Sequence, residues 1–117
     1  MTHDPIPVQG VVFPTDPAAL VTAQGIDGSA AGVEMLIDGQ TEAVMLGEAG
    51  PVMFVDAYGQ SKGQPANPRA TRFVDAYRPG FANADMIRGV AVVIGLDSET
   101  GARADVTAAD VDAALRA

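Results

Sequence analysis

The stretch Gly89-Val90-Ala91-Val92-Val93-Ile94-Gly95-Leu96 carries the strongest strand signal in this chain of 117 residues. A second run, Val52-Met53-Phe54-Val55, is also apolar at consecutive positions. An apolar run without alternation is typical of a strand whose two faces are both covered, because a half-exposed strand alternates apolar and polar residues. We therefore expect residues 52–55 and 90–94 to form the central strands of a sheet that is packed on both sides.

Shorter elements are predicted around these two strands. The Gly-rich connection 47–51 has a length common in hairpins, so residues 41–46 and 52–58 are expected to pair. Further strands are predicted at residues 8–13, 20–23 and 102–106, and helices at residues 30–37, 68–78 and 108–116. Ser29, Asn67 and Thr107 are suited to cap these helices, and Gly32 is expected to weaken the first by about 1 kcal/mol relative to Ala. Residues 59–66 are expected to form an exposed loop, and residues 81–85 to be irregular.

The order of these elements indicates the fold class. Strands and helices are mixed rather than strictly alternating, and no internal repeat is evident. This favours an α+β fold: one domain over residues 1–117, with a mostly antiparallel sheet packed with two to three short helices. Residues 1–7 precede the first strand and are expected to be flexible.

Charge is unevenly distributed along the chain, whose net charge is −8. Residues 1–61 contain eight Asp or Glu and no Lys or Arg. Residues 62–88, which we call the basic segment, contain five basic and two acidic residues, and residues 89–117 contain two Arg and five acidic residues. Binding to duplex DNA needs a basic surface, so we expect no direct binding to duplex DNA.

Patterns for catalysis and metal binding are weak. The single His, His3, lies near the N-terminus, where chains commonly fray, so no Ser–His pair is expected. Asp97 and Glu99 alternate as in a calcium loop, but Gly101 stands where that loop needs a further acid, so a turn is expected. The chain also lacks Cys and a phosphate-loop motif. We expect no enzyme activity, no metal and no cofactor.

Hydropathy bears on location. No apolar run is long enough to span a bilayer, and no charged-then-apolar leader follows Met1. We therefore expect no membrane partner and a cytoplasmic location.

Two stretches carry a family resemblance. The first is Lys62-Gly63-Gln64-Pro65-Ala66-Asn67-Pro68-Arg69-Ala70-Thr71, and the second is Asp85-Met86-Ile87-Arg88-Gly89-Val90-Ala91-Val92-Val93-Ile94-Gly95. With the order of elements, they resemble the family called domain of unknown function 3846, over roughly residues 8–106. Members of that family are small proteins encoded largely by phages, plasmids and bacterial mobile elements. The resemblance implies this provenance and the fold, and it implies no catalytic residues.

The basic segment is the candidate binding region. Asn67 and Pro68 open a helix whose free N–H groups attract anions, and Lys62, Arg69 and Arg72 lie close to it in sequence. Our leading hypothesis is a non-enzymatic accessory protein of a phage or mobile element that binds a host protein through loop 59–67 and helix 68–78. One alternative is binding of a small anionic ligand or nucleotide at residues 67–72. Another is an acidic mimic of nucleic acid that uses residues 1–61.

Overall fold

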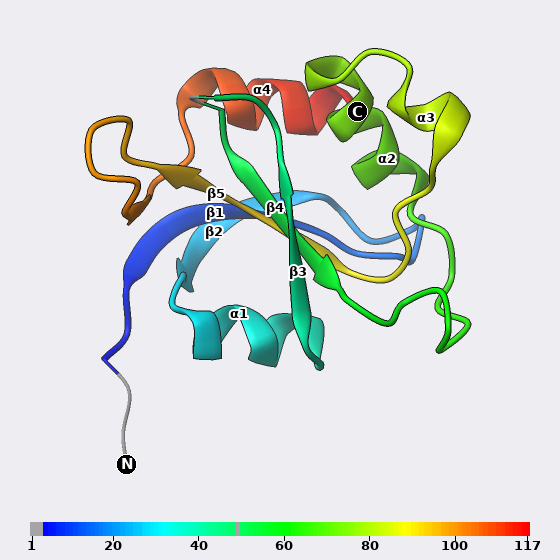
Figure 1. The fold of residues 1–117 in the computed structure, drawn as a ribbon, viewed down its shortest axis with the longest axis horizontal. Coiled ribbons are helices and arrows are strands. Elements are labelled where there is room, and N and C mark those ends of the chain that lie inside the picture. The colour runs from blue at the N-terminus through cyan, green and yellow to red at the C-terminus, as the bar shows by residue number, and fades with distance from the viewer. Residues whose placement is uncertain (1–3, 49) are drawn as a thin grey trace.

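β5 lies at the centre of an antiparallel sheet, as its sequence predicts (Figure 1). The strand order is β2-β1-β5-β4-β3, and the short β6 pairs with the end of β5. The strands are β1 (Pro7–Phe13), β2 (Thr22–Asp27), β3 (Thr41–Met45), β4 (Val52–Asp56), β5 (Ala91–Leu96) and β6 (Arg103–Ala104). This computed structural model describes residues 4–48 and 50–117. Residues 1–3, which include His3 and part of the segment expected to be flexible, lie outside that range.

Helices cover both faces of the sheet (Figure 1). One face packs on α1 (Ala30–Ile37), and the other packs on α2 (Pro68–Tyr77), α3 (Phe81–Ala84) and α4 (Ala108–Arg116). Along β5, Val92 and Ile94 join the core on the α1 side, while Val93 joins the core on the α2 side. All three side chains are fully buried. The prediction of an α+β domain whose central strands are covered on both faces is confirmed.

The predicted helix caps are present. The Ser29 hydroxyl accepts from the N–H of Gly32, the Asn67 side chain accepts from Ala70, and Thr107 and Asp110 form a reciprocal capping box. Asp110 also accepts a 2.5 Å hydrogen bond from the Tyr77 hydroxyl, which joins α4 to α2. These caps satisfy helix N–H groups that have no partner within the helix.

Four sequence predictions need correction. The second strand covers Thr22–Asp27 rather than 20–23, because its position follows six paired residues of β1 and not its own weak apolar pattern. Residues 81–84 form the short helix α3, so four helices rather than two or three occur in residues 4–48 and 50–117. Gly32 is required, since a Cβ there would collide with the backbone of Asp27. Loop 59–66 is not simply exposed, because Gly59 is buried and Gln64 is half-buried.

Candidate functional site

Lys62 anchors its loop through an ion pair. Its ammonium lies 2.8 Å from the Asp56 carboxylate, whose side chain is 1% exposed at the end of β4. Gln64 and the N–H of Tyr58 donate to the same carboxylate. The hydrogen bonds from Lys62 and Tyr58 hold the pKa of Asp56 below its ordinary value. Lys62 therefore has an intramolecular role, although its side chain stays 43% exposed.

Asn67 is a buried junction between three elements. Its Nδ2 donates to the carbonyls of Phe13 at 3.0 Å and Gly89 at 2.9 Å, and its Oδ1 accepts from the N–H of Ala70. Only 1% of the residue is exposed. The amide thus joins the end of β1, the start of α2 and the segment that leads into β5. This position leaves Asn67 no surface on which to receive a ligand.

The two arginines of the candidate set differ. The Arg69 guanidinium donates to the carbonyls of Ala19, Pro14 and Asp16, at 2.7–3.1 Å, and so holds the loop between β1 and β2. Arg72 is exposed, and among residues 4–48 and 50–117 it has no hydrogen bond or ion pair. Three of the four candidate residues are therefore engaged within the molecule. A binding surface built on all four stays a prediction.

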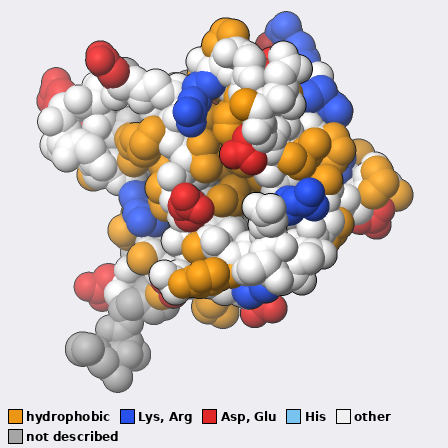
Figure 2. Space-filling view, turned by 45° about the vertical axis from the view of Figure 1, so that its right-hand side comes forward, with side chains coloured by type: hydrophobic (Ala, Val, Ile, Leu, Met, Phe, Trp, Pro, Cys, Tyr) orange, Lys and Arg blue, Asp and Glu red, His pale blue; other side chains and the backbone are white. Residues whose placement is uncertain are grey.

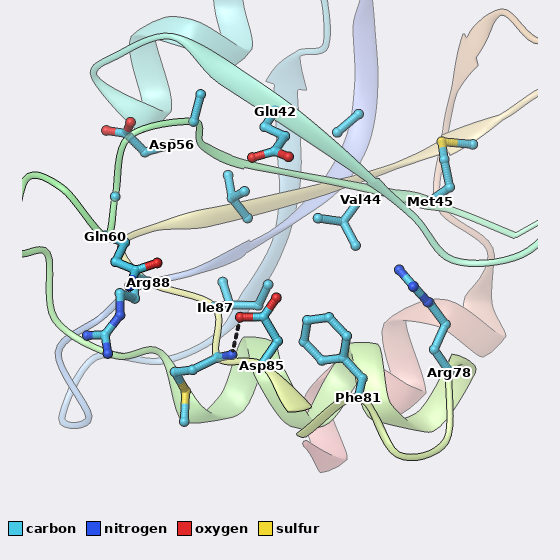
Figure 3. A pocket seen from close by; sticks show the side chains of 15 residues that line it. Glu42, Val44, Met45, Asp56, Gln60, Arg78, Phe81, Asp85, Ile87 and Arg88 are labelled. Carbon is cyan, nitrogen blue, oxygen red and sulfur yellow. Dashed lines mark hydrogen bonds between the residues drawn. The ribbon is translucent and has the colours of Figure 1, made fainter. Parts of the chain in front are cut away.

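A cleft of about 680 Å³ opens beside the other end of the basic segment (Figure 3). Its walls are β3 on one side, and on the other Arg78 at the C-cap of α2, Phe81 of α3 and residues 85–88. Half-buried Val44 and Phe81 and buried Ile87 give it an apolar floor. Figure 2 shows this face as a hollow with hydrophobic side chains at its bottom and both signs of charge around it.

The family motif positions this floor. The N–H of Asn67 donates to the Ile87 carbonyl, and the N–H of Ile87 donates to the Thr71 hydroxyl, which in turn donates to the Asn67 carbonyl. Gly89 has a φ of 80°, and a Cβ there would collide with the Gln64 side chain. The motif of residues 62–71 therefore fixes segment 87–89 against the start of α2.

Five charged side chains line the cleft, and one of them, Asp56, is paired with Lys62. Glu42 on β3 and Asp85 after α3 point toward one another near its middle (Figure 3). Arg78 lies at one end, with its guanidinium 5.7 Å from the centre of the Phe81 ring, and Arg88 lies at the other end. Within residues 4–48 and 50–117 neither Glu42 nor Asp85 has an ion-pair partner. The cleft thus has an acidic middle between two basic ends.

The outer edge of β3 is open. The N–H of Ala57 donates to the carbonyl of Gln40, and the N–H of Leu46 donates to that of Pro51, so both pairs are hydrogen-bonded pairs of the β3–β4 ladder. Along an antiparallel ladder, hydrogen-bonded pairs alternate with pairs that are not hydrogen-bonded to each other. The backbone groups of Thr41, Ala43 and Met45 therefore point away from β4. No strand follows β3 in the sheet of the described chain.

The lining of the cleft defines the contacts that it can offer a ligand. The cleft is lined by carboxylates, guanidinium groups, an amide and apolar side chains, and it contains no Ser, His or Cys. Residues 4–48 and 50–117 contain no group of three or more His, Cys, Asp or Glu placed to hold a metal. In the same residues, no helix is long and apolar enough to cross a membrane. What the cleft offers a ligand is backbone pairing, an apolar floor and charge.

The sequence did not reveal this cleft. One wall of the cleft, residues 78–88, belongs to the basic segment, and the positive charge of that segment is the sequence signal that points to this wall. The other wall is β3, and its place at the edge depends on the order of strands in the sheet.

Comparisons with known proteins bear on the family and the fold. The chain matches, over residues 10–116, the profile of a family described as a domain of unknown function (DUF3846), which confirms the resemblance seen in the sequence. It is also similar to a chain in the crystal structure of the small RNA methyltransferase HEN1, with a TM-score of 0.58 and 14% sequence identity. That similarity covers 96% of this chain and 16% of the methyltransferase chain, and at this identity it shows the fold alone. No curated protein matches the chain.

Proposed function

This chain belongs to the DUF3846 family, whose description assigns no activity, and we propose from the geometry of the cleft that it is a non-enzymatic binding protein. Its ligand is an extended segment of another polypeptide, which adds a strand to the open edge of β3. The side chains of that segment enter the cleft between β3 and α3.

The observation that carries the proposal is the outward backbone of Thr41, Ala43 and Met45 beside a cleft with charged walls and an apolar floor. An open edge offers three N–H and three C=O groups in the geometry that a further strand requires. Proteins usually protect such edges with Lys, Pro, a bulge or a covering element. β3 has neither Lys nor Pro, its one charged residue is Glu42, and all five of its residues pair in register with β4.

This proposal narrows the hypothesis drawn from the sequence. That hypothesis describes an accessory protein of a phage or mobile element that acts on a host protein in the bacterial cytoplasm. The cleft supports a polypeptide as the partner, because a backbone edge pairs best with another backbone. It moves the proposed contact from the start of α2 to its C-terminal end and α3. The origin of the chain and the identity of the partner rest on the family resemblance alone.

The alternatives have less support from the geometry. A small anion bound at residues 67–72 would meet Arg72 as an exposed cation. Asn67 is buried, and the Arg69 guanidinium is bonded to backbone carbonyls. The acidic-mimic hypothesis rests on the charge of residues 1–61, and no arrangement of the described residues among them adds to it.

A displayed library of random ten-residue peptides tests the proposal. We expect the enriched peptides to bind the unmodified protein and to lose binding to an Ala43→Pro variant. Proline removes the outward N–H of Ala43 and spares the ladder with β4, because that N–H does not point to β4. Ala23→Pro is the matched control. The N–H of Gly28 donates to the Ile6 carbonyl, so by the same alternation the N–H of Ala23 points outward from β2, the opposite edge.

Peptides that bind Ala43→Pro as tightly as the unmodified protein would refute β3 as the site. Loss of binding in Ala23→Pro alone would place the ligand on β2.

A further inference from the structure

We infer that the strand bound at β3 runs antiparallel to it, as the paired strands of the described sheet do, and places an apolar residue, any residue and a basic residue in that order along its chain. This inference rests on the proposed function and names the chemistry of its ligand. It follows from three properties of the cleft: which β3 side chains face it, which of its charges form no ion pair within the described residues, and where its apolar floor lies.

Side chains at even positions of β3 face the cleft. Glu42 pairs across the sheet with Val55, and Val44 pairs with Met53, and both partners belong to the core beneath α2. Residues opposite one another in antiparallel strands share a face. The ligand residues opposite Glu42 and Val44 therefore also enter the cleft. They are separated by one residue, whose side chain points to the α1 face.

The ligand residue opposite Glu42 meets an acidic environment. Glu42 and Asp85 point toward one another there, and both side chains are exposed (Figure 3). Opposite charges across strands attract, and like charges directly opposite one another repel. An ammonium or guanidinium group at this position would face one carboxylate from each wall of the cleft. Lys or Arg therefore fits this position, and Asp or Glu does not.

The cations of the cleft lie away from this point. Arg88 stands at one end, where its guanidinium approaches the Gln64 carbonyl at 3.4 Å. Arg78 stands at the other end, over the Phe81 ring. Neither guanidinium forms an ion pair with Glu42 or Asp85 in the described part of the chain. The acidic middle is thus available to a cation from the ligand.

The ligand residue opposite Val44 meets the apolar floor. Val44 and Phe81 are half-buried against the core beneath α2, and Figure 3 shows the Phe81 ring next to Val44. An apolar side chain there covers surface that is otherwise exposed to water. An antiparallel ligand passes Val44 before Glu42, so its apolar residue precedes its basic residue. The net charge of −8 further favours encounter with basic segments.

Three synthetic ten-residue peptides with identical Thr- and Val-rich flanks test the inference. Their centres are Phe-Thr-Lys, Phe-Thr-Glu and Ser-Thr-Lys, and their affinities are measured by calorimetry while the backbone amide signals of β3 are followed by NMR. We expect the Phe-Thr-Lys peptide to bind about tenfold more tightly than the Phe-Thr-Glu peptide, as for a close charge pair at an interface. We expect the Ser-Thr-Lys peptide to bind more weakly than the Phe-Thr-Lys peptide.

Charge reversal gives the decisive comparison. Glu42→Lys should invert the preference so that the Phe-Thr-Glu peptide binds more tightly. Glu34→Lys makes the same change in net charge at an exposed position of α1 and should leave the preference for the Phe-Thr-Lys peptide unchanged. Equal binding of all three peptides at β3 would overturn this inference and leave the proposed function standing. Binding of none of them to the unmodified protein would overturn both.

Discussion

Replacing Asn67 by Asp should destabilise the protein far more than a change of helix cap can. The substitution is isosteric, and Asp caps helices about as well as Asn, so a residue that acted only as a cap would tolerate it. In this structure Nδ2 of Asn67 donates to two buried carbonyls, at 2.9 and 3.0 Å. A carboxylate oxygen in that place would face two acceptors and donate to neither.

The size of the effect follows from these contacts. A buried polar group left without a partner costs about 1–3 kcal/mol, and an unpaired buried charge costs more. We therefore expect Asn67→Asp to lower the free energy of unfolding at pH 7 by roughly 3–5 kcal/mol, out of a total of about 5–15 kcal/mol for a domain. Asn83→Asp makes the same chemical change on the exposed α3 and should alter that free energy by less than about 0.5 kcal/mol.

The pH dependence of the free energy of unfolding of Asn67→Asp gives a second test of the role of Asn67. Burial against two carbonyls favours the neutral acid, so the folded-state pKa of the new carboxyl rises above the unfolded value of about 3.9. The deficit relative to the unmodified protein should thus be smallest below about pH 4, where the neutral acid still donates to one of the two carbonyls, and grow as the pH rises through the folded-state pKa. Urea unfolding between pH 4 and pH 8 measures it. A deficit within about 0.5 kcal/mol at pH 7 would show that Asn67 is only a cap.

Three further variants test the rest of the account. Asp56→Asn should lower the free energy of unfolding at pH 7 by roughly 2–3 kcal/mol. Because the folded-state pKa of Asp56 is lowered, its contribution to stability is present above about pH 4 and disappears as the pH falls through that pKa. Urea unfolding curves of the variant and the unmodified protein should therefore converge in acid. Thr107→Ala should cost about 1 kcal/mol and speed amide exchange in residues 108–111, and unchanged exchange would deny its role as a cap. Val92→Asp buries an unpaired charge in a fully buried site and should unfold the domain, and an unchanged melting curve would place Val92 outside the core.

Local patterns predicted the parts of the fold that depend on neighbours in sequence. The apolar runs of β4 and β5 identify buried strands directly. Ser29, Asn67 and Thr107 bond to N–H groups three residues away, so their capping roles can be read from the sequence. β2 shows the limit, because its residues carry little apolar pattern and its bounds follow from pairing with β1.

The candidate site depends on contacts that are distant in sequence. The capping role of Asn67 was predictable, but its bonds to Phe13 and Gly89 span 54 and 22 residues. The carbonyls that Arg69 binds lie 50–55 residues away, so its role depends on the fold. Lys62 is only six residues from Asp56, but their contact requires the turn that follows β4. Predicting the cleft requires the order of strands in the sheet, because that order places β3 at an edge with one face toward α3.

Amide hydrogen exchange of β3 during peptide binding tests the central claim most directly. A ligand strand should protect the N–H groups of Thr41, Ala43 and Met45, which point away from β4. The N–H groups of Glu42 and Val44 point to β4 in the free protein, so their exchange should change little. This alternating pattern is the predicted result. Protection confined to the first turn of α2 or to β2, or none in β3 with a peptide bound, would contradict the account.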